Sequence, residues 1–208
     1  MSKADERCGG LGLSPLTAAI RNLPRMLLSS ARPVVLITGI SASGKTTVAE
    51  LLARRFERGV HVKGDVFRRM IVAGRQEMTS DPTEEAWQQL RLRYGLGAQV
   101  ADAYHDAGFA VVVQDVVIGS VLAEYLSAIR SRPLVLVVLA PSPDVVATRE
   151  STRSKVAYRA GFDDIAALDQ GLHGDTPRIG LWLDSSDQNP EQTVDEIVER
   201  GLDDGVID

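Results

Sequence analysis

Two glycines, a lysine and a threonine stand at a spacing that suits phosphate chemistry. Gly39 and Gly44 enclose four residues, and Lys45 and Thr46 follow directly. Because glycine has no Cβ atom, the backbone between the glycines can curl until successive N–H groups converge on an anion. The Lys45 ammonium can bridge the β- and γ-phosphates of a nucleotide, and the Thr46 hydroxyl can ligate Mg²⁺. The pattern predicts a loop that binds a nucleoside triphosphate together with Mg²⁺.

The residues around this loop predict the elements that must position it. An apolar run over about 33–38 predicts a buried strand before the loop. Apolar side chains from Val48 to Phe56 recur on one face, which predicts a helix over about 45–57 whose N–H groups and positive dipole end face the phosphates. A simple Gly/Ser-rich turn between strand and helix is the alternative. The predicted nucleotide contacts in this segment are Gly39, Ser41, Ala42, Ser43, Gly44, Lys45, Thr46 and Thr47.

Composition and charge limit the classes of protein that fit. The 208 residues are 44% hydrophobic and 25% charged, as in an ordinary globular domain. The net charge of −5 does not favour a polyanionic partner, so nucleic acid is not the expected ligand. Cys8 is the single cysteine, which excludes a disulfide within the chain. Since no apolar run approaches about 18 residues, we expect a cytoplasmic protein that does not enter a membrane.

Strand-like and helix-like stretches alternate along the chain. Runs at about 33–38, 60–63, 109–113, 134–139 and 179–183 predict five strands, with helices between them. Such alternation favours parallel strands joined by right-handed crossovers. We therefore predict an α/β domain over 33–208, with a five-stranded parallel sheet flanked by helices on both faces, and a partly ordered N-terminal appendage over 1–32. The helix that begins near Pro82 is expected to be broken or loosened near Gly95 and Gly97.

Two acidic residues follow strands whose carboxyl ends should meet the phosphate loop. Asp65 follows the strand at 60–63, and Asp115 follows the strand at 109–113. Asp65 can take the proton of an attacking hydroxyl, although an aspartate here can also cap the next helix. Arg68, three residues further on, can hold an acceptor group or pair with Asp65. Asp115 can organise Mg²⁺, contact the acceptor or serve as a purely structural acid.

Two arginines lie on one helix face ahead of a basic segment. Arg149 and Arg153 are four residues apart, and Lys155 and Arg159 follow them. Arginines that close over a γ-phosphoryl group can neutralise the charge that builds up during its transfer. The segment over about 149–163 is therefore predicted to be a lid, and a solvated basic helix is the alternative.

With these residues assembled, the chain resembles the small P-loop kinases, in particular the chloramphenicol phosphotransferase-like and zeta-toxin-like groups. Gly39–Thr46 is similar to their Walker A loop, Gly64–Arg68 to the D-x-x-R segment whose aspartate is the base, and Arg149–Arg153 to the R-x-x-x-R of their lid. The resemblance implies that Arg149 lies on the adenine, that Arg153 contacts phosphates and that the turn after 181–183 lies near the adenine. Gln114 departs from the phosphotransferase pattern, where an acid is common.

The residues and the resemblance together predict an ATP-dependent phosphotransferase. It would move the γ-phosphoryl group of Mg·ATP to a hydroxyl of a small molecule, such as an antibiotic, a nucleoside or a sugar conjugate. The predicted catalytic residues are Asp65, Lys45 and Arg153; the predicted acceptor contacts are Asp65, Arg68 and Asp115; the predicted Mg²⁺ ligands are Thr46 and Asp115.

Three alternatives stay open at this point. One is a toxin-like kinase that a partner protein neutralises, with residues 1–32 as a docking arm. A polynucleotide 5′-hydroxyl kinase shares the same plan but needs a basic, aromatic channel. Only Arg91, Arg93 and Tyr94 hint at such a channel. A regulatory nucleotide-binding switch shares the phosphate loop, although the N-K-x-D motif of guanine-specific switches is absent. The sequence predicts no oligomeric state.

Overall fold

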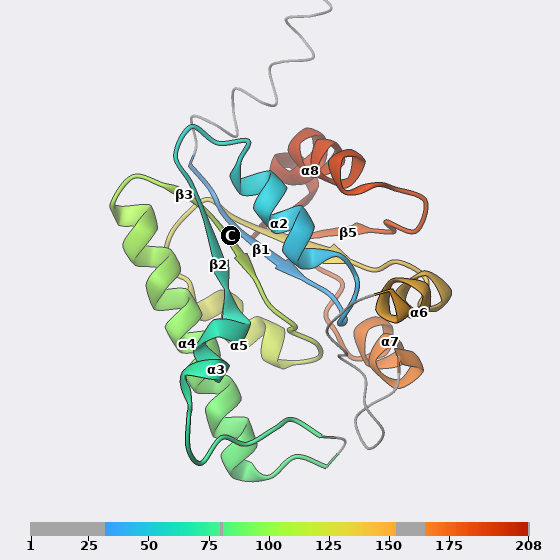
Figure 1. Ribbon diagram of the computed structural model, residues 1–208. Coiled ribbons are helices and arrows are strands. Elements are labelled where there is room, and N and C mark those ends of the chain that lie inside the picture. The colour runs from blue at the N-terminus through green and yellow to red at the C-terminus, as the bar shows by residue number, and fades with distance from the viewer. Residues whose placement is uncertain (1–31, 80, 153–164, 208) are drawn as a thin grey trace, which may run out of the picture.

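The computed structural model describes residues 32–79, 81–152 and 165–207, and it contains one central sheet (Figure 1). Five parallel strands stand in the order β2-β3-β1-β4-β5, which confirms the predicted α/β architecture. The strands are β1 (Val34–Thr38), β2 (Gly59–Lys63), β3 (Ala110–Gln114), β4 (Leu134–Leu139) and β5 (Leu181–Leu183). The predicted appendage at 1–32 and most of the predicted lid lie outside the described residues.

A sixth, short strand was not predicted from the sequence. β6 (Val206–Ile207) pairs antiparallel with the start of β4. The helix before it ends at Asp204, and the carbonyl of the following Gly205 accepts a hydrogen bond from the Leu136 amide (2.8 Å), which holds this end of the chain beside β4. Two residues are too few to give a period-2 pattern that could be recognised in a sequence.

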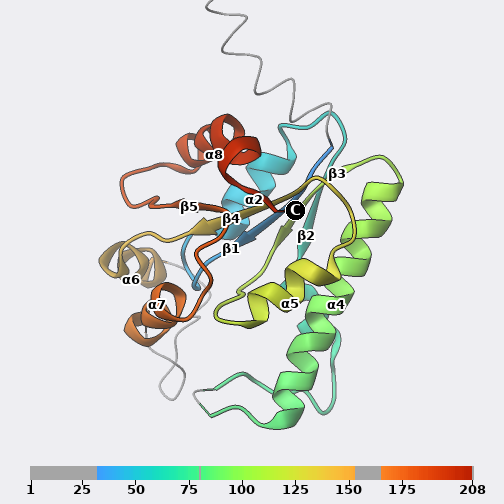
Figure 2. The same cartoon turned by 180° about the vertical axis from the view of Figure 1, so that it is seen from behind.

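Helices cover both faces of the sheet, as predicted (Figures 1 and 2). α2 and α8 pack against one face, and α4 and α5 pack against the other. The described helices are α2 (Lys45–Ala53), α3 (Gly64–Met70), α4 (Glu84–Asp106), α5 (Val121–Ala128), α6 (Pro143–Ser151), α7 (Ile165–Gly174) and α8 (Pro190–Asp204). None of the described helices is long and apolar enough to cross a lipid bilayer.

α4 continues without interruption through both of its glycines, so the expected break near Gly95 and Gly97 was wrong. Gly97 is buried, and a Cβ atom there would lie 2.3 Å from the hydroxyl oxygen of Tyr125 on α5. The glycine therefore permits close packing of two helices. Tertiary packing of this kind outweighs the weak helix propensity of glycine.

The parallel register places the ends of three strands at one edge of the sheet. Ile37 of β1 lies opposite Gln114 of β3, which in turn lies opposite Lys63 of β2. The loop after β1 is fixed to the segment after β3 through Thr38, whose hydroxyl donates to the Val117 carbonyl (2.8 Å) and accepts from its amide (2.9 Å). As a result, the phosphate loop, the start of α3 and Asp115 all lie at the edge formed by the carboxyl ends of the strands. Ligands of parallel sheets bind at this edge.

Candidate active site

The phosphate loop adopts a conformation that only its particular residues allow. Gly39 has φ 139°, and a Cβ atom there would lie 2.3 Å from the carbonyl oxygen of Leu139. Gly44 has φ 98° and precedes the first residue of α2, and Ala42 is left-handed with φ 62°. Side chains other than glycine rarely adopt the first two of these conformations. The loop is thus a curled backbone that leads into a helix N-terminus, which is the arrangement that binds phosphate.

Lys45 lies buried inside this loop. Its Nζ donates to the Ile40 carbonyl (2.6 Å) and lies 3.4 Å from Oγ of Ser43. The Lys45 ammonium is therefore held inside the loop, where it can donate hydrogen bonds to the oxygens of a bound phosphate chain. Thr46, the predicted Mg²⁺ ligand, is exposed at the start of α2. The curled loop and the Lys45 ammonium therefore fit the triphosphate that the sequence predicts, and the Thr46 hydroxyl fits the predicted Mg²⁺.

Arg149 reaches the phosphate loop from the last turn of α6. Its Nη1 donates to the Ser43 carbonyl (3.3 Å), and its Nη2 donates to the Ser185 carbonyl in the turn after β5 (2.9 Å). The guanidinium thus joins the phosphate loop to the turn that the resemblance places near the adenine. Arg153, the second predicted lid arginine, lies outside the described residues.

Asp65 lies in the first turn of α3, at the same edge of the sheet as the phosphate loop. Lys63, not Asp65, stands at the N-cap position of this helix, so the capping role considered for Asp65 is not the one observed. The Asp65 carboxylate instead pairs with two arginines of its own helix, Arg68 (3.1 Å) and Arg69. The Asp65 side chain is 32% exposed.

Asp115 is almost completely buried directly behind the start of α3. A Cβ atom at Gly64 would lie 1.9 Å from its Oδ2, so only glycine fits at that position. Arg93 of α4 binds both carboxylate oxygens, with Nε 2.8 Å from Oδ2, and the Val116 amide donates to Oδ1 (2.7 Å). Burial lowers the pKa of the Arg93 guanidinium. Both oxygens of the predicted Mg²⁺ ligand are therefore engaged by the protein.

Arg93 and Glu77 are parts of this site that the sequence did not identify. Arg93 was considered only as part of a nucleic-acid channel, yet it is buried against Asp115. Glu77, in the segment between α3 and α4, pairs with Arg68 and with Arg75 (3.1 Å). Arg93 and Asp115 are 22 residues apart, and Arg68 and Glu77 are nine apart, so only the folded structure identifies these two pairs.

The aromatic stripe on α4 belongs to the core. Tyr94 stacks on Tyr125 with ring centroids 4.7 Å apart, and its hydroxyl donates to the Val116 carbonyl (2.8 Å). Burial raises the pKa of Tyr94 to about 12. Trp87 and Leu90 pack against the same cluster. The stripe therefore positions α4, and through it Arg93, beneath the site.

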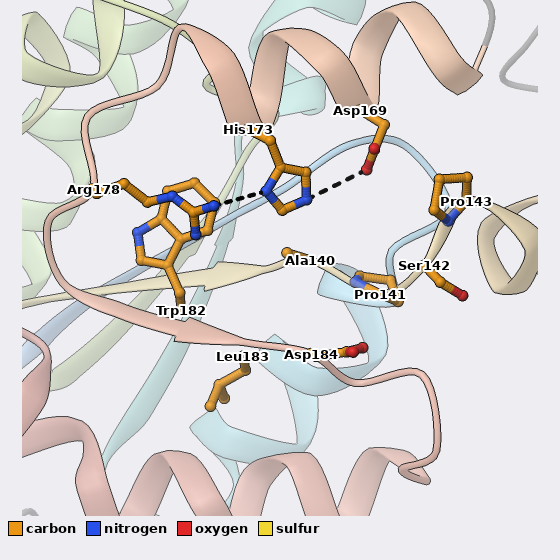
Figure 3. Close-up of a pocket in the computed structure, with 10 residues that line it drawn as sticks. All are labelled: Ala140, Pro141, Ser142, Pro143, Asp169, His173, Arg178, Trp182, Leu183 and Asp184. Carbon is orange, nitrogen blue, oxygen red and sulfur yellow. Dashed lines mark hydrogen bonds and ion pairs between the residues drawn. The ribbon is translucent and has the colours of Figure 1, made fainter.

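A cavity of about 370 Å³ lies beyond the carboxyl ends of β4 and β5 (Figure 3). Arg178 lies over the Trp182 ring at 4.1 Å, and its Nη2 is 3.1 Å from Nδ1 of His173. Nε2 of His173 also lies 3.6 Å from a carboxylate oxygen of Asp169. The cavity wall is tied to the turn after β5, because the Ser142 amide donates to the Ser186 hydroxyl (2.8 Å). The lining residues are Ala140, Pro141, Ser142, Pro143, Asp169, His173, Arg178, Trp182, Leu183 and Asp184.

A phosphate loop after the first strand of a parallel sheet, with helices on both faces, defines a P-loop domain. The sequence signature of the AAA domain family matches residues 34–172, and the chain belongs to that family. A comparison with curated proteins gave no match.

Several solved structures share this fold. A sugar kinase from Janibacter sp. HTCC2649 is 26% identical, with a TM-score of 0.57 over 84% of this chain and 95% of its own. An APS kinase from Mycobacterium tuberculosis, in complex with AMPPNP and APS, is 20% identical, with a TM-score of 0.59 over 81% and 96%. A tunicamycin resistance protein from Deinococcus radiodurans is 16% identical, with a TM-score of 0.57 over 85% and 98%. This P-loop domain therefore has the fold of small kinases.

Proposed function

We propose that this protein is a kinase that transfers the γ-phosphoryl group of Mg·ATP to a hydroxyl of a small molecule. One observation carries the proposal: the Asp65 carboxylate stands at the same edge of the sheet as a preformed phosphate loop that contains Lys45. A phosphoryl group and a base at one edge are what a transfer to an alcohol needs. The similarity to a sugar kinase and an APS kinase supports a small acceptor.

Each site residue has a separate role in this proposal. The loop amides and Lys45 hold the β- and γ-phosphates, and Thr46 ligates Mg²⁺, which neutralises charge on the phosphates when it is bound. Asp65 receives the proton of the acceptor hydroxyl. Arg149 lies along the nucleoside, near the turn after β5 and the cavity beside it, and Arg153 completes the charge neutralisation from the lid. Residues 1–32 take no part in the chemistry.

The role of Asp115 in the proposal is to support the site from behind. Since Arg93 and the Val116 amide engage its carboxylate, direct ligation of Mg²⁺ would require Arg93 to leave a buried pair. Contact with Mg²⁺ through a water molecule, or with the acceptor, would not require that loss. The same pair disfavours a polynucleotide kinase, because Arg93 is buried and Arg91 pairs with Glu124 (3.2 Å).

The direct test is transfer of label from γ-labelled ATP with Mg²⁺ to a panel of acceptors. The panel holds sugars, sugar acids, nucleosides, hydroxyl-bearing antibiotics and 5′-hydroxyl oligonucleotides; the tunicamycin resistance neighbour supports including antibiotics. We expect a labelled small molecule with the wild type and a loss of about 10²–10⁴-fold in rate with Asp65→Asn. ATP binding without transfer to any acceptor would instead favour a nucleotide-binding switch.

A further inference from the structure

Two arginines hold a single carboxylate beside the proposed base. Arg68 Nη1 pairs with Oε2 of Glu77, and Arg75 Nε lies 3.1 Å from Oε1 of the same side chain. Each carboxylate oxygen therefore faces its own guanidinium. Arginines bind phosphate, sulfate and carboxylate groups with this geometry. The two arginines already form an anion site, and its occupant is a side chain of this protein.

Arg68 connects this anion site to Asp65. Its Nε donates to Oδ1 of Asp65 (3.1 Å), while Nη1 of the same guanidinium contacts Glu77. Because a guanidinium is rigid and planar, the two carboxylates lie on neighbouring edges of one small group. A ligand anion in the place of Glu77 would therefore bring a hydroxyl on a nearby carbon within reach of Asp65.

The Glu77 carboxylate can leave its two arginines with little loss of folding free energy. The Arg68 and Glu77 side chains are 30% and 38% exposed, and ion pairs with this much solvent contribute little to stability. The segment that carries Glu77 is fixed independently by Gln89, which donates to the Gly74 carbonyl (2.9 Å) and accepts from the Gln76 amide (2.8 Å). This segment keeps those anchors when Glu77 moves away.

The charges around the site also favour an anionic ligand. Once Glu77 has moved away, the guanidiniums of Arg68, Arg69 and Arg75 stand against the single carboxylate of Asp65. The buried pair of Arg93 and Asp115 is internally neutral and adds no net charge. A neutral acceptor cannot replace the charge of Glu77, so Glu77 would keep its place between Arg68 and Arg75.

We propose that the acceptor carries an anionic group a few bonds from its reactive hydroxyl, and that Arg68 and Arg75 bind this group at the place that Glu77 occupies. The acceptor class thus comprises hydroxyl compounds with a phosphate, sulfate or carboxylate. This inference rests on the proposed kinase function for the transfer step, but the anion site can be tested without any transfer.

The binding test uses the full chain saturated with AMPPNP, into which sodium sulfate is titrated by calorimetry. Removal of the competing charge in Glu77→Gln should tighten sulfate binding by roughly tenfold, since a charge-assisted hydrogen bond is gained by the ligand. Arg75→Ala should weaken it. Glu50→Gln and Arg54→Ala change an exposed ion pair on α2 and serve as matched controls that should behave like the wild type. Equal sulfate affinity in wild type, Glu77→Gln and Arg75→Ala would overturn the proposal.

The kinetic test compares acceptors that differ chiefly in charge, gluconate with glucitol and 3′-AMP with adenosine. We expect at least about tenfold higher kcat/KM for the anionic member of whichever pair is phosphorylated. Glu77→Gln should lower KM for that member and leave the neutral one unchanged. Equal use of both members, or a Glu77→Gln variant that raises KM for both, would contradict the anion site while leaving the kinase intact. If no acceptor is labelled, the kinase function fails, and sulfate binding alone decides the anion site.

Discussion

The buried pair of Arg93 and Asp115 should be a main support of the site. The exposed fractions of the two side chains are 13% and 2%, so neither charge can recover its hydration if its partner is removed. Replacing Arg93 by Met keeps the unbranched apolar stem of the side chain but removes the guanidinium, which leaves the Asp115 carboxylate buried without its ion-pair partner. Breaking a buried pair in this way costs about 3–5 kcal/mol of unfolding free energy. We expect that loss for Arg93→Met.

The partner variant separates charge from packing. Asp115→Asn keeps the shape of the side chain, so the double variant Arg93→Met/Asp115→Asn removes the buried charge together with its counterion. The double variant should lose less unfolding free energy than the two single variants lose together, by about 2 kcal/mol or more. Urea unfolding, followed by the fluorescence of Trp87 and Trp182, measures all three variants.

The matched control lies two residues away on the same helix. Arg91 pairs with Glu124 on the surface, where the two side chains are about half exposed. Arg91→Met should cost no more than about 0.5 kcal/mol. If Arg93→Met costs as little as Arg91→Met, or if the effects of Arg93→Met and Asp115→Asn simply add, the reasoning from burial is wrong.

Three further predictions concern the phosphate loop, α4 and the dependence of stability on pH. Gly39→Ala should abolish AMPPNP binding in calorimetry and lower the melting temperature, because φ is 139° and a Cβ atom there would lie 2.3 Å from the Leu139 carbonyl oxygen. In α4, a Cβ atom at Gly95 would meet nothing within 4 Å. Gly95→Ala should therefore raise the free energy of unfolding by about 0.5–1 kcal/mol. Burial, with a smaller effect from Lys63, lowers the pKa of His61 from 6.5 to about 4. The unfolded chain therefore binds the proton first, and stability present above pH 6.5 is lost as the pH falls toward 4, by about 1–2 kcal/mol after allowance for partial exposure. His61→Val should flatten this part of the stability–pH curve, and an unchanged slope would contradict the assignment.

The sequence was sufficient wherever a feature rests on neighbouring residues. The phosphate loop follows from residues 39–46, and the apolar runs around it place it at the end of a buried strand. Since parallel strands end at one edge, the position of Asp65 at the same edge as the loop followed as well. These features were predictable because strand, turn and helix signals are local.

The rest depended on contacts between distant residues. Gly97 was predicted to interrupt the helix, because the sequence does not show that the hydroxyl of Tyr125 packs against it. The sequence left three roles open for Asp115, in organising Mg²⁺, in contacting the acceptor or as a structural acid, and it gave no sign that Arg93, 22 residues earlier, binds its carboxylate. Glu77 carried no signal, since Arg68, nine residues earlier, reaches it only after α3 and the following segment have folded. Such pairings are decided by tertiary packing and leave no periodic trace in the sequence.

The most direct test of the central claim is the transfer of label from γ-labelled ATP to an added acceptor, measured side by side for wild type and Asp65→Asn. If the protein is a kinase with Asp65 as its base, the wild type yields a labelled small molecule that the variant makes about 10²–10⁴-fold more slowly, while both bind AMPPNP equally well. Equal rates of transfer by the two chains, or no transfer by either despite normal AMPPNP binding, would contradict the account.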